Sequence, residues 1–136
     1  MHEGTRQKNV VLILAREFAT RLSTPMFVAD ADGRLVFYNE PAEQVIGRTF
    51  AESGEMSADS WGALLQIEDL DGNLVPLEQR PSGIAFFQHR ASHEKFQMTG
   101  LDGVKRIISS TAFPLLGRDD ELLGVVLIFW EEKAAP

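Results

Sequence analysis

Two histidines and a run of hydroxyl side chains are the residues of this chain whose types are best suited to chemistry. His89 and His93 are four residues apart, a spacing that would put both imidazoles on one face of a helix. A zinc site needs further protein ligands, and no third one stands at a matching spacing. Ser109, Ser110 and Thr111 follow one another without a histidine and an aspartate spaced to activate them as nucleophiles. We therefore expect neither a metal centre nor a catalytic site.

The composition excludes several other classes of chemistry. The 136 residues contain no cysteine, which rules out disulfides, iron–sulfur clusters and thiolate chemistry and suits a reducing compartment. The formal net charge of −7 disfavours nucleic acid as a partner, since phosphate recognition needs clustered lysine and arginine. The apolar runs 10–14 and 122–130 are far shorter than the roughly 20 residues of a membrane span. We expect a single-domain, cytoplasmic, globular protein.

The elements that must position these side chains begin with a long helix and a hairpin. Residues 5–22 carry apolar side chains at three- and four-residue steps, which is typical of an amphipathic helix: Val11, Leu14, Phe18 and Leu22. Segments 25–30 and 34–39 follow and are rich in strand-forming residues. Between them lies Asp32-Gly33, a pair that favours a tight turn joining two antiparallel strands.

Asn39 stands where the second of these strands leads directly into a helix. Pro41 opens that helix, which we expect over 40–46, and Gly47 should end it. Backbone groups at such a junction lack partners, and the short amide of asparagine offers both a donor and an acceptor. We expect Asn39 to cap the helix and to take no part in chemistry.

The second half of the chain predicts short helices followed by three strands. The helices fall near 61–65 and 82–88, and the strands cover 94–99, 104–116 and 122–130. Together with the hairpin these strands make one five-stranded sheet, so the fold class is α+β. We divide the chain into an N-terminal helical segment, a single domain and a tail, with the bounds 1–21, 22–132 and 133–136.

The hairpin and the helix after it resemble the amino-terminal signature of the PAS domain, a sensory module of bacterial signalling proteins. The signature places are occupied by Asp30, Gly33, Asn39, Ala42, Glu43, Gly47 and Glu52. The strands over 94–130 are similar to the carboxy-terminal part of that family. The resemblance implies an antiparallel sheet flanked by short helices. Many PAS domains end in Asp-x-Thr, where this chain has Glu131-Glu132, so we expect either an excised sensor or a module that acts alone.

The resemblance also implies a central cavity between the helix over 82–88 and the sheet. The side chains expected to bind a ligand there are Val28, Phe37, Val45, Trp61, Ile84, Phe87, Phe96, Met98, Ile108 and Phe129. Phenylalanine and methionine adapt to irregular guests, so a small apolar ligand such as a fatty acid is the favoured occupant. The carboxylate of a fatty acid would need a donor, and the candidates are Arg80, His89, Arg90 and Trp61.

Two alternatives stay open at this stage. Apolar side chains on a helix and a sheet are usually core, so the chain could be an interaction or dimerisation module with a filled interior and no ligand. It could instead be a haem or flavin redox sensor, and the resemblance places an axial haem ligand near His89 or His93. A flavin that forms a cysteine adduct is excluded because the chain has no cysteine. We disfavour both chromophores.

The last predicted strand, 122–130, is apolar on both faces. One face should line the cavity, so the other must also be hidden from water. The amphipathic helix is the obvious cover, and PAS helices of this kind often pack between two copies. We expect a homodimer built from this helix and the outer face of the sheet, with a signalling protein as a further partner. The competing account is a monomer whose helix folds back on its own sheet.

Overall fold

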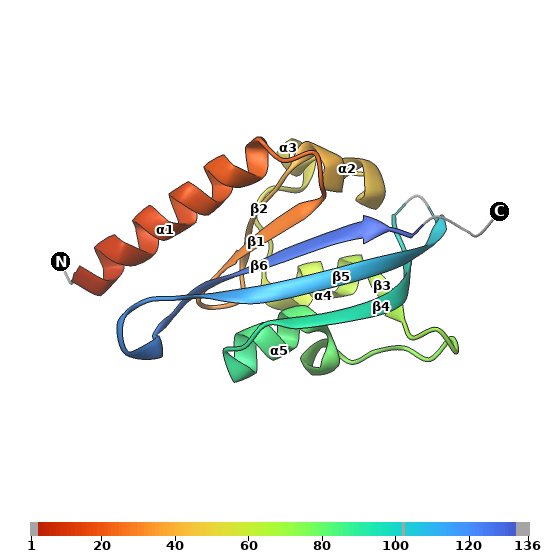
Figure 1. Ribbon diagram of the computed structural model, residues 1–136. Helices are drawn as coiled ribbons and strands as arrows, with labels where there is room; N and C mark the ends of the chain where they lie inside the picture. The colour runs from red at the N-terminus through yellow and green to blue at the C-terminus, as the bar shows by residue number, and fades with distance from the viewer. Residues whose placement is uncertain (1–2, 102, 133–136) are drawn as a thin grey trace.

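Six antiparallel strands form one sheet in the order β2-β1-β6-β5-β4-β3 (Figure 1). The computed structural model describes residues 3–101 and 103–132, with side chains from residue 10 onward. The strands are β1 (Met26–Asp30), β2 (Leu35–Tyr38), β3 (Gln66–Glu68), β4 (Ser92–Thr99), β5 (Lys105–Leu116) and β6 (Leu122–Glu131).

Helices lie on both sides of this sheet, with α1 on the opposite side from α4 and α5 (Figure 1). The helices are α1 (Glu3–Thr20), α2 (Glu40–Ile46), α3 (Phe50–Ser53), α4 (Ala58–Leu64) and α5 (Pro81–Gln88), with two short 3-10 turns, η1 (Leu77–Gln79) and η2 (Arg118–Asp120). The α+β class is therefore confirmed, and the predicted elements agree with the structure to within a few residues at most boundaries.

The expectation of five strands is corrected by β3, which pairs with β4 at the edge of the sheet. Ile67 of β3 lies opposite Met98 of β4 and is buried. The strand has only three residues, which is too short for an alternation of apolar and polar side chains to predict it. It brings Ile67 into the interior.

The inner face of the sheet carries the main core. Phe27 of β1, Phe96 of β4 and Phe129 of β6 are buried on this side together with Trp61 of α4. The ring of Phe27 lies between 5.3 and 5.9 Å, centroid to centroid, from the rings of Tyr38, Trp61 and Phe129. These aromatic contacts, each favourable beyond the area that it buries, leave little open space at the centre.

On the outer face of the sheet, α1 covers β1 and part of β6 through a second apolar cluster. The residues of α1 and its exit that face the sheet are Leu12, Ala15, Ala19 and Leu22. Gly124 of β6 permits the close approach: a Cβ atom there would lie 2.9 Å from Cδ2 of Leu12 and 2.7 Å from the carbonyl oxygen of Ala29. The middle of α1 is thus positioned by a notch in the sheet at Gly124.

The helix face that meets the sheet differs from the one expected from periodicity. Leu14 and Phe18 were expected on the buried side with Val11 and Leu22, yet they are 62% and 57% exposed. Six consecutive apolar residues occupy 10–15, so the helix is apolar on more than one side and the three- and four-residue spacing fits more than one face. Only one of these helix faces packs against the sheet.

Both helix caps predicted around α2 are confirmed. The side chain of Asn39 accepts a hydrogen bond of 3.2 Å from the backbone N–H of Ala42. Gly47 ends the helix with a φ of 92° and donates its N–H to the carbonyl of Glu43. That left-handed conformation favours glycine because it has no Cβ.

The division of the chain into 1–21, 22–132 and 133–136 stays a prediction, and residues 1–2 and the tail lie outside the described residues. Within residues 3–101 and 103–132, no helix is both long and apolar enough to span a bilayer.

Candidate ligand cavity and apolar helix face

A cavity of about 30 Å³ lies between α4, η1, the start of α5 and the inner face of the sheet. Of the side chains expected to bind a ligand, five line it together with the anchor candidate Arg80: Trp61, Phe96, Met98, Ile108 and Phe129. Lining residues that the sequence analysis missed are Leu65, Ile67, Leu77, Ser82, Ser110 and Leu127, among others. Ile67 could not be foreseen because β3 was not.

A second cavity, of about 60 Å³, adjoins the first and is almost entirely apolar. It lies between α4, α5 and the turn of the β1–β2 hairpin, and the two cavities share Trp61, Leu77 and Ser82 as lining residues. Phe87, one of the expected ligand-binding residues, lines this second space and is 64% exposed. Drug-sized ligands usually occupy about 300–1,000 Å³, so both cavities are small.

Four of the expected ligand-binding residues lie away from both cavities. Val28 and Phe37 belong to the outer cluster under α1, because neighbouring residues of a strand point to opposite faces. Their neighbours Phe27 and Tyr38 face the interior instead. The other two, Val45 of α2 and Ile84 of α5, are half-buried and line neither cavity.

Among the anchor candidates, Arg80 and Trp61 line the first cavity. The Nε of Arg80 donates to the carbonyl of Val75 at 3.1 Å, and its Nη1 donates to the carbonyl of Gly62 at 3.0 Å. Burial lowers the pKa of Arg80, because removal from water disfavours the charged form. The indole N–H of Trp61 is already engaged with the carbonyl of Gly33 at 2.9 Å, so Trp61 contributes an apolar wall and no donor.

The remaining anchor candidates, His89 and Arg90, are exposed at the end of α5. His89 ends the helix with a φ of 54°, and Arg90 donates to the side chain of Gln88 at 2.9 Å. His93 lies on β4, where its Nδ1 is 2.6 Å from Oγ1 of Thr111. His89 and His93 therefore do not share a helix face, and no group of three acidic or histidine side chains within the described residues could hold a metal ion.

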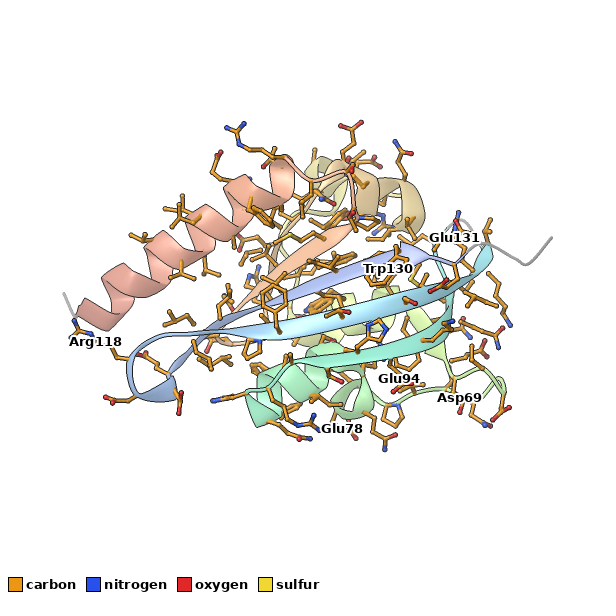
Figure 2. The ribbon with its side chains drawn as sticks, in the orientation of Figure 1. Asp69, Glu78, Glu94, Arg118, Trp130 and Glu131 are labelled. Carbon is orange, nitrogen blue, oxygen red and sulfur yellow. The ribbon has the colours of Figure 1, made fainter. Side chains whose placement is uncertain are left out.

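The side of α1 that faces away from the sheet is apolar and exposed. Side chains project from it into solvent (Figure 2), and those between 50% and 62% exposed are Val10, Ile13, Leu14 and Phe18. We call these four residues the α1 stripe. The uncovered outer face of the sheet adds Ile107 of β5 and Trp130 near the end of β6 (Figure 2), which are 46% and 41% exposed.

Comparison with known proteins identifies the architecture. No family model and no curated protein sequence matches the chain. Among solved structures, the PAS domain of BvgS from Bordetella pertussis is 16% identical with a TM-score of 0.62, covering 91% of this chain and 87% of that one. The PAS domain of nitrogen regulation protein NR(II) from Vibrio parahaemolyticus is 12% identical with a TM-score of 0.61, covering 88% and 98%.

The chain has a PAS fold. A LOV protein from Rhodobacter sphaeroides is similar as well, at 15% identity and a TM-score of 0.68, covering 99% of this chain and 71% of that one. The resemblance noted in the sequence is thus confirmed at the level of the PAS fold. Within this PAS fold the interior is closely packed, and the α1 stripe leaves four apolar side chains of one helix in contact with water.

Proposed function

We propose that this chain is a non-enzymatic PAS sensory module that forms a homodimer through α1 and transmits its signal through that contact. The observation that carries the proposal is the α1 stripe, four apolar side chains exposed on a helix whose other side is already packed on the sheet. A cytoplasmic location remains the expected one, because a chain without cysteine suits a reducing compartment.

The spacing of the α1 stripe supports a helix as its partner. Val10, Ile13, Leu14 and Phe18 follow one another at steps of three, one and four residues, which places them along one side of the helix. A seam of this kind can meet its own copy about a two-fold axis, because the same patch then serves both subunits. The exposed Ile107 and Trp130 would extend the contact onto the sheet.

The interior supports a filled core without a ligand rather than a bound fatty acid. The two cavities of about 30 and 60 Å³ are several times smaller than ordinary ligand pockets, and Phe27, Trp61 and Phe129 occupy the centre. Native mass spectrometry of gently purified protein tests this reading. We expect the mass of the bare chain, and a retained fatty acid would contradict it.

The residues of this chain do not fit a haem or a flavin either. His89 directly follows α5, the helix that borders both cavities, but it is exposed to solvent. Neither cavity approaches the size of these cofactors, and Trp61 and Phe129 would have to leave the core to admit one. We therefore favour a colourless protein that signals through contacts between chains.

The dimer is tested by light scattering on the full chain and two matched variants. Leu14→Ser removes the centre of the α1 stripe, whereas Leu74→Ser changes a leucine that is similarly exposed, at 67%, on a distant loop. We expect a dimer for the wild type and for L74S, and a monomer for L14S with an unchanged far-ultraviolet circular dichroism spectrum. A wild-type monomer, or equal behaviour of the two variants, would overturn the proposal.

A further inference from the structure

The first half of β4 (Ser92–Thr99) is an open edge of the sheet. β3 pairs with residues 97–99 of β4, and within the described residues no strand pairs with 92–96 on that side. The three successive residues His93, Glu94 and Lys95 are exposed to solvent. An unpaired strand edge can accept a strand from another chain, so this segment is suited to an intermolecular contact.

The hydrogen bond that closes the β4–β5 hairpin shows which backbone groups are free. The N–H of Gly100, directly after β4, donates to the carbonyl of Val104 at 3.3 Å, so the even-numbered residues of β4 bond to β5. Successive residues of an antiparallel strand direct their backbone groups to opposite sides. The N–H and C=O groups of His93 and Lys95 therefore point away from β5, where no segment of the described chain bonds to them.

The side chains along this edge differ in charge and in the face that they occupy. Lys95 lies on the outer face, where its Nζ is 4.0 Å from Oε1 of Glu132 and its side chain is 50% exposed. His93 lies on the same face and stacks on Trp130, with 5.9 Å between the ring centroids. Glu94 points to the other face, projects into solvent (Figure 2), and belongs to no ion pair among the described residues.

A second copy of β4 does not match this edge. If two β4 strands paired about a two-fold axis at Glu94, the two carboxylates would lie opposite each other, and pairing at Lys95 would oppose two ammonium groups. Like charges directly opposite destabilise a strand pair. Pairing at His93 would place Glu94 opposite Ser92 and Lys95 opposite Ala91, so neither charge would gain a partner. A different sequence is therefore the better occupant.

We propose that the open edge of β4 binds an extended segment of a partner protein by antiparallel strand addition. The segment carries an acidic residue opposite Lys95 and, directly after it, a basic residue opposite Glu94. Backbone bonds to His93 and Lys95 provide the attachment, and the two opposite-charge pairs select the sequence.

This contact goes beyond the α1 dimer and does not depend on it. α1 covers β1 and part of β6, whereas β4 lies beyond β5 in the order of strands. Both contacts can therefore form at once, and the edge of β4 would give the PAS module a binding site for a signalling partner.

Hydrogen exchange of the ¹⁵N-labelled full chain tests first whether the edge is open. The N–H groups of His93 and Lys95 should exchange rapidly, and those of Glu94 and Phe96 slowly, because only the second pair bonds to β5. The probe is the capped peptide Val-Thr-Glu-Lys-Thr-Val-Thr. At ten times its Kd, exchange at His93 and Lys95 should slow by about tenfold.

Two methylated peptides test for strand addition. In the proposed register the N–H of the glutamate of the peptide bonds to β4, and the N–H of its lysine points away. N-methylation of the glutamate should therefore raise the Kd by about fivefold or more. N-methylation of the lysine should change it little.

Exchanging charges tests the selection of sequence. A second peptide with glutamate in place of the lysine should bind about fivefold more weakly to the wild type. Glu94→Lys should reverse this preference. Glu131→Lys adds the same charge on β6, two strands away (Figure 2), and should leave the preference as in the wild type.

Several results would overturn the proposal. Protection of His93 and Lys95 in the free chain would mean that the edge is already occupied, by this chain or by a second copy. The absence of added protection with peptide, or equal effects of the two methylations, would exclude strand addition. Equal preferences in E94K and E131K would show an unspecific charge effect. Light scattering on the same samples reports the α1 dimer separately, and L14S should bind the peptide with the Kd of the wild type.

Discussion

The side-chain amide of Asn39, at the junction of β2 and α2, donates a hydrogen bond of 2.9 Å to the backbone carbonyl of Ala19 at the end of α1. The same Nδ2 donates to the carbonyl of Thr24, and Oδ1 accepts from the N–H groups of Met26 and Ala42. Asn39 is 2% exposed. It therefore does more than cap α2, because it ties the end of α1 to the first strand and to the helix that follows the hairpin.

Replacing Asn39 by alanine should lower the free energy of unfolding by about 2–4 kcal/mol, because four backbone groups lose a hydrogen bond and three of these bonds are buried. A simple helix cap would cost only about 1 kcal/mol. Urea unfolding measures the difference. Asn73→Ala is the control, since Asn73 is exposed and its Nδ2 donates to Oδ2 of Asp69 at 3.3 Å. A loss no larger than that of N73A would contradict the role of Asn39 as a tie.

Asn39→Asp separates the two roles of this side chain. A carboxylate can accept from Met26 and Ala42 but cannot donate to Ala19 or Thr24. We expect α2 to keep its protection in hydrogen exchange while the last turn of α1 exchanges faster. Equal loss of protection in both helices would show that the hydrogen bonds donated by Nδ2 of Asn39 do not stabilise α1 separately from α2.

Replacing Gly124 by alanine, the smallest change that adds a side chain, should destabilise the protein. In Gly124→Ala the new Cβ would lie 2.7 Å from the carbonyl oxygen of Ala29 and 2.9 Å from Leu12, so α1 must shift or the strand must bend. Overpacking of this kind costs about 1–3 kcal/mol. Gly62→Ala is the matched control, because the contacts of its Cβ with Leu77 are ordinary ones of 3.5 Å and alanine favours a helix. Equal melting temperatures for the two variants would contradict the claim that α1 packs closely against the sheet at Gly124.

Tyr38 should make stability depend on alkaline pH. Burial raises the pKa of Tyr38, whose hydroxyl donates to the carbonyl of Arg48 and lies 3.0 Å from Oγ of Ser53. Because the pKa is higher in the folded state, this contribution to stability is complete below about pH 10 and is lost as the pH rises through the folded-state pKa. Tyr38→Phe should abolish that part of the decline.

The chain has a single tyrosine, so the near-ultraviolet absorbance of tyrosinate reports on Tyr38 alone. In the folded protein its titration midpoint should lie above that of the urea-unfolded chain. Coinciding midpoints would mean that the phenol is not buried as the structure places it.

The features that sequence reasoning recovered are those fixed by local chemistry. The turn at Asp32-Gly33, the cap at Asn39 and the left-handed end at Gly47 each depend on properties of one or two residues, and the structure contains all three. The order of strands after the hairpin followed from long runs of strand-forming residues. These elements together were sufficient to indicate the PAS fold.

The features that it missed are decided by packing between distant segments. β3 is too short to show a pattern, and it exists because Ile67 can pair with Met98. The face of β1 could not be chosen because every residue from Met26 to Ala29 is buried, so Val28 and Phe27 looked equivalent. Ser82 and Ser110 line the same cavity. The sequence could not show this, because the two serines belong to α5 and β5, which are far apart along the chain.

The most direct test of the α1 dimer uses the absence of cysteine. Leu14→Cys places a single thiol in the α1 stripe, and Leu74→Cys places one at a similarly exposed control position. After mild oxidation, gel electrophoresis without reductant should show most of the L14C chain as a linked dimer and L74C as a monomer. If L14C stays monomeric, or links no faster than L74C, then α1 does not join two copies and the proposed route of signalling is wrong.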